Sequence, residues 1–371
     1  MENHIVIIGG GLAGWATACA FVDNNYSIDL FEGNNQNFGA QQISPNGWNA
    51  LSELIDINKV RPFFENFNII KIKSMSSNQK LNLLSSHNIK SDEINYGSIE
   101  RSSIIKLLKD KVRKTNLVKE HRSNINYIIS NNGTQEIIDD KGNTYKTKFI
   151  IGADGINGVT KKFVVGFDNS LKMKKVYRSV SFNEEPYKLT KGLIQLIFTS
   201  NGHFVIYPTI IEDKKATNYI FVPSDDLFLP PTIKNKSLSF LIPHDIKWEQ
   251  TLAIKDKGEN SAIHKSGVLL VGEASSPMPP HIAQAGNQIL EDAVFIKANL
   301  IKNNSLKKTI NKFITKRQDE KKNVAQQSIV IGKILSSKNL IGSLRDLTIQ
   351  SIGSNILENI LDPIWKLEYN E

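Results

Sequence analysis

The chain has 371 residues, of which 40% are hydrophobic and 22% are charged, and 46 Lys and Arg against 37 Asp and Glu give a formal net charge of +9. This composition is ordinary for a packed globular protein and excludes a wholly disordered or fibrous chain. The positive charge is nearly all lysine. Because arginine is the residue that reads phosphates and base edges bidentately, the scarcity of arginine predicts no nucleic-acid partner.

The first elements form a βαβ pattern. His4–Ile8 is a short apolar run that ends in glycine, which is typical of a buried parallel strand, and a helix over Ala13–Val22 and a strand over Ser27–Phe31 follow. The single cysteine, Cys19, lies in the predicted helix, where we expect a core residue. One cysteine cannot form an internal disulfide, so the fold needs no oxidising compartment.

The uncharged run over residues 5–22 resembles a signal peptide or a membrane span. The preceding residues, Met1–His4, argue against export because they include an acid and no Lys or Arg. Glycines at positions 9, 10, 11 and 14 also interrupt the run. We therefore expect a cytoplasmic protein.

The middle of the chain changes from helical to strand-like patterns. The spacing of Ile and Leu predicts a helix over 101–118, and hairpin signals at 132–133 and 141–143 precede a strand at 149–151. Strand-like runs then sit among turns and prolines, and they predict a separate antiparallel sheet; these runs are 192–199, 203–207 and 219–222.

The last third begins with another buried strand, Val268–Val271, and a proline-rich loop over 277–280 separates it from a helix that begins near Gly286. Beyond residue 305 the pattern is predominantly helical, with a turn near 336–342. Residues 328–367 mix Ile and Leu with Lys at roughly helical spacing, which leaves two interpretations open: a helix packed on the core, or a face that makes peripheral contact with a membrane.

The glycine-rich turn after the first strand predicts a dinucleotide site. Gly9-Gly10-Gly11-Leu12-Ala13-Gly14 fits G-x-G-x-x-G between a strand and a helix. In that context Gly9 allows the tight turn, Gly11 lets the backbone approach a pyrophosphate and Gly14 permits close helix–strand packing. The helix N-terminus supplies N–H donors for the phosphates. Glu32 ends the second strand, where a carboxylate accepts ribose hydroxyls, and this favours FAD or NAD over NADP.

Four further segments accompany this turn: Phe38–Asn46, Glu100-Arg101-Ser102, Gly152-Ala-Asp-Gly155 and Val271–Pro280. With the dinucleotide motif they resemble the single-component FAD-dependent aromatic hydroxylases. This family has the para-hydroxybenzoate-hydroxylase-like fold and includes salicylate, 3-hydroxybenzoate and ubiquinone-pathway ring hydroxylases. The resemblance covers nearly the whole chain.

The resemblance implies an α/β fold with a Rossmann-like FAD-binding domain, an inserted antiparallel-sheet substrate domain and a C-terminal helical segment. The expected boundaries are 1–165 and 263–304 for the two parts of the FAD-binding domain, 166–262 for the substrate sheet and 305–371 for the helical segment.

The resemblance also implies a set of FAD contacts. Arg101 matches an arginine that contacts the pyrophosphate or ribityl region, Asp154 matches an aspartate that handles both FAD and NAD(P)H, and Glu273 occupies the position that holds the ribityl hydroxyls. The other expected cofactor contacts are Gly9, Gly11, Gly14 and Glu32 at the ADP part, and Gly155, Gly272, Pro280, Gly286 and Asn287.

The segment after Val271 suits a flat ring. Pro277, Pro279 and Pro280 fix φ and make a stiff loop, and the positive end of the helix near Gly286 suits the negative charge that develops on a reduced flavin. On the substrate side, His281 in this loop and His203 and Tyr207, which share one face of a predicted strand, are candidate catalytic residues. The alternative for each is a packed or solvated residue.

The activity implied by the resemblance is an FAD-dependent monooxygenase. It uses NAD(P)H and O2 to hydroxylate a small aromatic or quinone-precursor ring through a flavin C4a-hydroperoxide. The cofactor carries such chemistry, so no catalytic triad is needed. The seven histidines show no ligand spacing, and we predict no metal.

Four positions depart from the family pattern, and the first is Gly33, which follows Glu32 where arginine is common. Glu273 stands where an aspartate is usual, Ser276 stands where histidine is common, and Ala285 stands where a glycine is usual, with Gly286 one place later. The departures at Glu273 and Ala285 leave open an FAD-binding protein that does not hydroxylate and acts as a partner or regulator. A flavin epoxidase for a non-aromatic substrate is a second enzymatic alternative. The sequence does not predict the oligomeric state.

Overall fold

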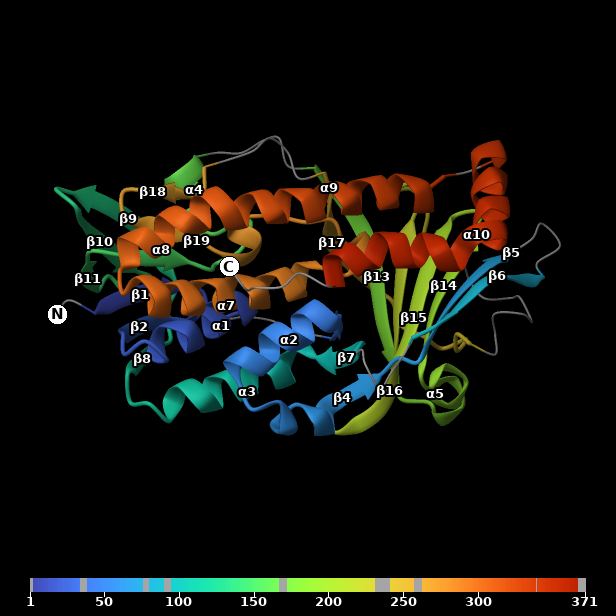
Figure 1. Cartoon of the computed structure of the whole chain (residues 1–371), viewed down its shortest axis with the longest axis horizontal. Coiled ribbons are helices and arrows are strands. Elements are labelled where there is room, and N and C mark those ends of the chain that lie inside the picture. Colours follow the sequence, from blue (N-terminus) through green and yellow to red (C-terminus); the bar gives the residue numbers. More distant parts are fainter. Residues whose placement is uncertain are drawn as a thin grey trace.

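Two large sheets at opposite ends of the molecule organise the fold (Figure 1). The computed structural model describes residues 3–33, 39–75, 80–89, 95–166, 172–230, 241–256, 262–337 and 339–365. Helix α9 (Gln318–Leu335) connects the two ends, because Lys321 contacts Ser275 beside the first sheet while Leu335 packs against Ile72 and Phe198 of the second.

The six-stranded sheet has the order β18-β19-β12-β1-β2-β8, and all its neighbouring strands are parallel except β18 and β19. Its strands are β1 (His4–Ile8), β2 (Ser27–Phe31), β8 (Val118–His121), β12 (Ile150–Gly152), β18 (His264–Lys265) and β19 (Val268–Leu270). Ile5–Ile8 is buried throughout, as expected for a parallel strand covered on both faces. The predicted βαβ unit is confirmed.

Helix α1 (Leu12–Val22) is buried along its whole length. It packs between the sheet, α3 (Arg101–Arg113) and α7 (Ala285–Asn303), which explains why its residues are apolar or small on every side. Cys19 is 0% exposed in this helix, as predicted, and burial raises the pKa of its thiol to about 12. This thiol is therefore an inert core group.

The seven-stranded sheet has the order β17-β13-β16-β15-β14-β5-β6. Its strands are β5 (Ile69–Met75), β6 (Leu81–Asn88), β13 (Lys172–Ser181), β14 (Leu193–Thr199), β15 (Gly202–Ile211), β16 (Lys214–Pro223) and β17 (Glu249–Asp256). All neighbouring pairs are antiparallel except β14 and β5, which are parallel. The three strand-like runs predicted between 192 and 222 are strands of this sheet.

The expected boundary at residue 165 needs a correction. β5 and β6 lie within 1–165, yet they pair with each other and with β14 in the seven-stranded sheet. Alternation along a strand predicts its two faces but not its partner, so the sequence pattern did not place these strands. The other expected boundaries stay a prediction.

Two small sheets and several helices complete the fold. The sheets are β3-β7-β4, with β3 (Ala40–Ile43), β4 (Phe64–Asn66) and β7 (Gly97–Glu100), and β11-β10-β9, with β9 (Ile125–Asn131), β10 (Thr134–Asp139) and β11 (Thr144–Thr147). The remaining helices are α2 (Pro45–Leu54), α4 (Val159–Val165), α5 (Glu184–Thr190), α8 (Leu306–Lys312), the π-helix Phe313–Arg317 and α10 (Asn339–Trp365).

Two helix boundaries differ from the sequence pattern. The helix predicted over 101–118 ends at Arg113, and Val118 begins β8, because an apolar residue near a helix end fits either pattern. The turn predicted near 336–342 is shorter, since α9 ends at Leu335 and α10 begins at Asn339.

Helix α10 has both apolar contacts and exposed apolar residues. Ile349 packs with Ile72 and Phe198, whereas Ile341 and Leu344 are exposed. Among the described residues no helix is long and apolar enough to cross a membrane. Peripheral membrane contact and the cytoplasmic location stay predictions.

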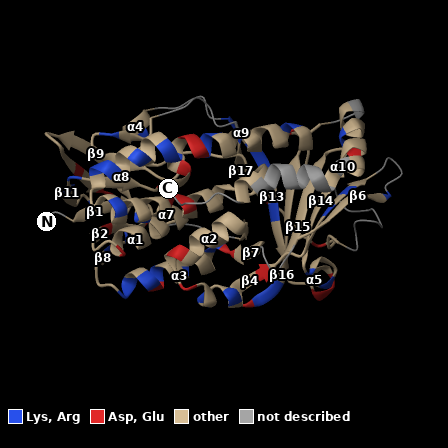
Figure 2. Ribbon diagram, viewed as in Figure 1, with Lys and Arg blue, Asp and Glu red and all other residues tan. Residues whose placement is uncertain are grey.

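The positive charge is distributed along the molecule. Figure 2 shows Lys and Arg on α3, α8, α9 and β13, and Asp and Glu also occur on α3 and α9. The absence of a nucleic-acid partner stays a prediction.

Candidate functional site

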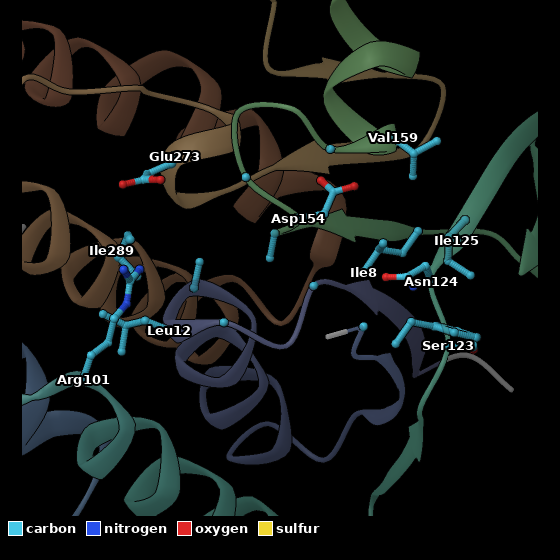
Figure 3. A pocket seen from close by; sticks show the side chains of 18 residues that line it. Ile8, Leu12, Arg101, Ser123, Asn124, Ile125, Asp154, Val159, Glu273 and Ile289 are labelled. Atoms are coloured by element: carbon cyan, nitrogen blue, oxygen red, sulfur yellow. The ribbon is translucent and has the colours of Figure 1, made fainter. Parts of the chain in front are cut away.

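A cavity of about 390 Å³ lies at the carboxyl ends of β1 and β12. Its wall combines the turn between β1 and α1, the turn after β12, the start of α3 and the 3₁₀ turn Gly272–Ala274. Arg101 and Glu273 lie at one end of the cavity, and Ser123, Asn124 and Ile125 lie at the other (Figure 3). The structure thus brings together six predicted residues: Gly9, Gly11, Arg101, Asp154, Gly155 and Glu273.

The glycine-rich turn leaves the N-terminus of α1 open to this cavity. Gly9 has a φ of +115°, which favours glycine, and a Cβ there would meet the backbone of Ala153. A Cβ at Gly11 would have no heavy atom within 4 Å, so there is free space beside the start of α1, where the N–H groups of a first helical turn have no partner within the helix. Gly14 does not line this cavity and instead allows α1 to approach the Gly9 carbonyl.

Arg101 and Glu273 belong to both this cavity and a second one. Arg101 is the first residue of α3, and its Nε is buried without a hydrogen-bond partner among the described residues. Glu273 stands in the turn that follows β19. A guanidinium and a carboxylate are therefore placed where the two cavities meet.

Asp154 has a structural partner. Both of its carboxylate oxygens accept hydrogen bonds from Thr160, one from the backbone N–H at 3.0 Å and one from the hydroxyl, so the side chain caps the start of α4. Burial raises the pKa of this carboxyl. The predicted role in FAD and NAD(P)H handling stays a prediction beside this capping role.

Glu32 directly follows β2, next to the glycine turn, but does not line the cavity. Lys109 Nζ donates to its two oxygens at 2.9 and 2.8 Å, and Lys109 also lies over the Trp15 ring. A carboxylate oxygen accepts more than one hydrogen bond, so the predicted ribose contact stays compatible with this ion pair.

The second cavity, of about 290 Å³, lies between the seven-stranded sheet and the loop before α7. Its wall is mainly apolar, with Ile194, Leu196, Val205 and Ile220 from the sheet. Besides Arg101 and Glu273, five predicted residues line this cavity: His203, Tyr207, Pro280, His281 and Gly286.

The two histidines of this cavity are held neutral. Burial lowers the pKa of His203 to about 3, and the nearby His281, Lys174 and Arg345 add to the effect. Burial, together with Lys174, lowers the pKa of His281 to about 4. The rings lie 6.3 Å apart, and His281 Nδ1 has no hydrogen-bond partner within the described chain.

Tyr207 makes a hydrogen bond to β3, outside the seven-stranded sheet. Its hydroxyl donates to the Ala40 carbonyl at 3.3 Å, and burial raises the pKa of the phenol to about 12. It is therefore a neutral wall residue at ordinary pH.

Two other predicted contacts line neither cavity. Gly272 has a φ of +60° and allows close approach to Ala13. Asn287 is fully buried, accepts from the Ser44 N–H at 3.2 Å and donates to the Ala283 carbonyl at 2.8 Å. Both residues pack against segments that line the cavities, and a direct contact of either residue with the cofactor stays a prediction.

Sequence reasoning missed several polar residues of the second cavity, and two of them have buried atoms without a partner. Gln41 and Arg178 line it, and Gln41 Nε2 and Arg178 Nε are buried without a partner in the described structure. Arg178 lies in β13, whose lysines obscured the strand pattern. The sequence does contain one indication of its position, because Arg178 stands two residues from both Val176 and Val180 and therefore shares their face of a strand.

The fold is similar to several solved structures. It matches Klebsiella pneumoniae HpxO complexed with FAD and uric acid with a TM-score of 0.79 and 14% identity, over 98% of this chain and 97% of that one. It matches a salicylate hydroxylase substrate complex with a TM-score of 0.76 and 17% identity, over 100% of this chain and 97% of that one. The chain has the fold of the FAD-dependent aromatic hydroxylases. The fold class predicted from the sequence is confirmed.

Similarity in sequence agrees with this hydroxylase fold. The chain is 22% identical to 3-hydroxybenzoate 6-hydroxylase of Klebsiella oxytoca, over 78% of this chain and 77% of the relative. It is 20% identical to the FAD-dependent monooxygenase ausM of Penicillium brasilianum, over 67% of this chain and only 60% of that relative's length. No protein-family model matches the chain. The resemblance stated from the motifs is confirmed.

Proposed function

We propose that the chain is an FAD-dependent monooxygenase that uses NAD(P)H and O2 to hydroxylate a small aromatic ring. One observation carries this proposal: the cavity at the glycine turn and the apolar cavity on the sheet share Arg101, Glu273 and Ile289. A cofactor that extends from the turn therefore reaches the second cavity, where a flat apolar substrate fits.

The residues of the first cavity fit FAD. The open N–H groups at Gly11 suit the pyrophosphate, and the partnerless Nε of Arg101 is a donor for a phosphate or ribityl oxygen. Glu273 supplies carboxylate oxygens for ribityl hydroxyls. FAD supplies the redox and oxygen-transfer chemistry when it is bound.

The residues of the second cavity suit an aromatic substrate. The apolar sheet face excludes water and orients the ring, which protects a reactive centre from hydrolysis. A neutral His281 with a free Nδ1 accepts a proton or hydrogen bond from a phenolic hydroxyl, which makes the ring more electron-rich.

The experiment is a purification followed by absorption spectra and a panel of phenols. We expect bound or reconstitutable FAD, oxidation of NADH or NADPH that each accepted phenol stimulates, and a hydroxylated product. A protein that cannot be loaded with FAD would overturn the proposal.

Because Glu273, Ser276 and Ala285 depart from the family pattern, the same experiment must also distinguish a monooxygenase from the two alternatives. Tight FAD without stimulated oxidation or product would favour a non-catalytic flavoprotein, and an epoxide product from an alkene would favour an epoxidase. Glu273→Asp introduces the residue that is usual in the family. If the wild type is active, we expect this variant to bind FAD as well.

A further inference from the structure

We propose that Gly332 of α9 is a positioning residue, which holds the ring of His281 so that Nδ1 of that ring faces a phenolic hydroxyl of the substrate. This inference rests on the proposed function and deepens it, because it names the residue through which α9 acts on the substrate site.

One face of α9 lies against the second cavity and the loop that carries His281. Four residues at the spacing i, i+3, i+4 and i+7 share this face: Ser328, Ile331, Gly332 and Leu335. Ile331 and Leu335 line the cavity. Ser328 Oγ donates to the Pro279 carbonyl at 2.7 Å, which joins the helix to the loop. This face of α9 is therefore a wall of the cavity beside His281.

The imidazole of His281 packs directly on the backbone of α9 at Gly332. A Cβ at Gly332 would overlap this ring, and the nearest atoms would be Cδ2 and Nε2. Glycine within a helix lowers its stability relative to alanine, so a buried helical glycine usually has a packing reason. The close approach of the His281 ring supplies that reason.

This contact determines which edge of the ring is available to a ligand. Because Cδ2 and Nε2 face Gly332, Nδ1 lies on the edge that points away from α9. Nδ1 is buried, and no described residue is its hydrogen-bond partner. A buried polar atom without a partner is costly, and a ligand that supplies a partner removes this cost. Since His281 lines the cavity, a phenolic hydroxyl there is such a partner.

The backbone around His281 is held on both sides. Ser328 binds the Pro279 carbonyl before it, and Asn287 Nδ2 donates to the Ala283 carbonyl after it at 2.8 Å. The torsions of the His281 side chain are therefore the main freedom that remains, and Gly332 limits them. A larger residue at position 332 should turn the ring, because a side-chain end gives way more easily than a held backbone.

The first test measures ligand binding to the FAD-loaded protein by calorimetry. The probes are 2-, 3- and 4-hydroxybenzamide, each compared with benzamide, which lacks the hydroxyl. We expect at least one isomer to bind more tightly than benzamide by about 3- to 10-fold, as for one hydrogen bond to a neutral acceptor. Gly332→Ala and His281→Ala should each abolish this hydroxyl preference, and the double variant should show no further loss.

The second test compares the Tm of the same variants. Gly332→Ala should lower the Tm of the wild type, because the His281 ring must leave its position. In the His281→Ala background the overlap is gone, so the same change should leave the Tm unchanged or raise it, since alanine favours a helix. Lys333→Ala places an alanine at the next, exposed position of α9 and should keep both the Tm and the hydroxyl preference.

A further variant covers the case in which Gly332→Ala does not load FAD. The double variant with His281→Ala should then load it, because the overlap with the ring is removed. Ser328→Ala adds no volume and releases the Pro279 carbonyl, so it should reduce the hydroxyl preference in a protein that still binds FAD.

The outcomes separate this inference from the proposed function. The role of Gly332 would be overturned by a wild type without a hydroxyl preference, by a full preference in Gly332→Ala, or by equal Tm losses in the two backgrounds. A double variant that fails to load FAD along with Gly332→Ala would also overturn it. Stimulated oxidation with phenols would leave the monooxygenase proposal intact in each case. A wild type that cannot be loaded with FAD overturns the proposed function instead.

Discussion

Arg101 is the residue whose change isolates cofactor binding. Its Nε is buried, partnerless and placed where the two cavities meet. Charge-assisted hydrogen bonds contribute about 1.5–3 kcal/mol, so Arg101→Gln should weaken FAD binding by about 10- to 100-fold. The dissociation constant is measured by quenching of flavin fluorescence. Lys106→Gln, at an exposed position of the same helix, should bind FAD as the wild type does, and equal affinity of the two variants would contradict the assignment.

His203 and His281 make the stability of the fold depend on pH. Because their folded pKa values are about 3 and about 4, below the usual 6.5, the unfolded chain binds more protons in this window. The free energy of unfolding should therefore fall as the pH drops below 6.5 and continue to fall to about pH 4, by about 1.4 kcal/mol per pH unit for each histidine. His203→Gln should lose less stability than the wild type between pH 7 and pH 5.

The measurement is the Tm of both proteins across this pH range. His244→Gln is the control because His244 is exposed. A His203→Gln protein whose Tm falls as steeply as that of the wild type would show that the folded and unfolded chains protonate His203 alike, and would contradict the lowered pKa.

At the scale of elements, a buried ionic cluster joins α7, α9 and the turn that carries Glu273. Arg317 Nε donates to Asp292 at 3.0 Å and its Nη2 donates to Glu291 at 2.8 Å. Lys321 Nζ donates to Asp292 and to Ser275 Oγ, both at 2.9 Å. The π-helix Phe313–Arg317 positions Arg317 for these contacts, and such turns are frequent at functional sites.

Breaking this cluster should affect both stability and the cofactor. Lys321→Met leaves Asp292 partly unpaired in the core, so we expect a loss of about 3–5 kcal/mol in the free energy of unfolding. We also expect weaker FAD binding, since Ser275 loses a partner next to Glu273. Urea unfolding and FAD titration measure the two effects.

The neighbouring Lys322 provides the control for this variant. It pairs with Asp319 at 3.0 Å on the surface, so Lys322→Met should cost less than about 1 kcal/mol. Similar losses in the two variants would mean that the cluster contributes no more than a surface ion pair.

The sequence predicted the elements that carry short-range signals. The glycine turn, the buried strands and the loop before α7 each combine apolar runs with Gly or Pro at fixed places, and the structure has them where expected. The cluster of Arg317, Lys321 and Asp292 has no such signal, because its members lie on separate helices and meet only after packing. Arg178 was missed for another reason, because the lysines of β13 obscure the alternation of that strand.

At the scale of the whole molecule, the cofactor cavity gathers segments that are distant along the chain. Residues near 11, 101, 154 and 273 line it, so the cofactor makes contacts that hold these segments together. A ligand that binds only the folded state stabilises it by about 2.7 kcal/mol at 100 times its dissociation constant. We therefore expect FAD to raise the Tm, and riboflavin, which lacks the ADP part, to raise it less.

Gly11→Val tests this coupling without disturbing the apoprotein. Gly11 has a φ of −81°, and no heavy atom lies within 4 Å of its Cβ position, so the new side chain fits the unliganded fold without backbone strain. It nevertheless fills the space beside the N–H groups at the start of α1, where the pyrophosphate is expected to bind. The variant should keep the Tm of the apoprotein and lose the FAD-dependent rise. A full rise with FAD in Gly11→Val would mean that the cofactor binds away from the glycine turn.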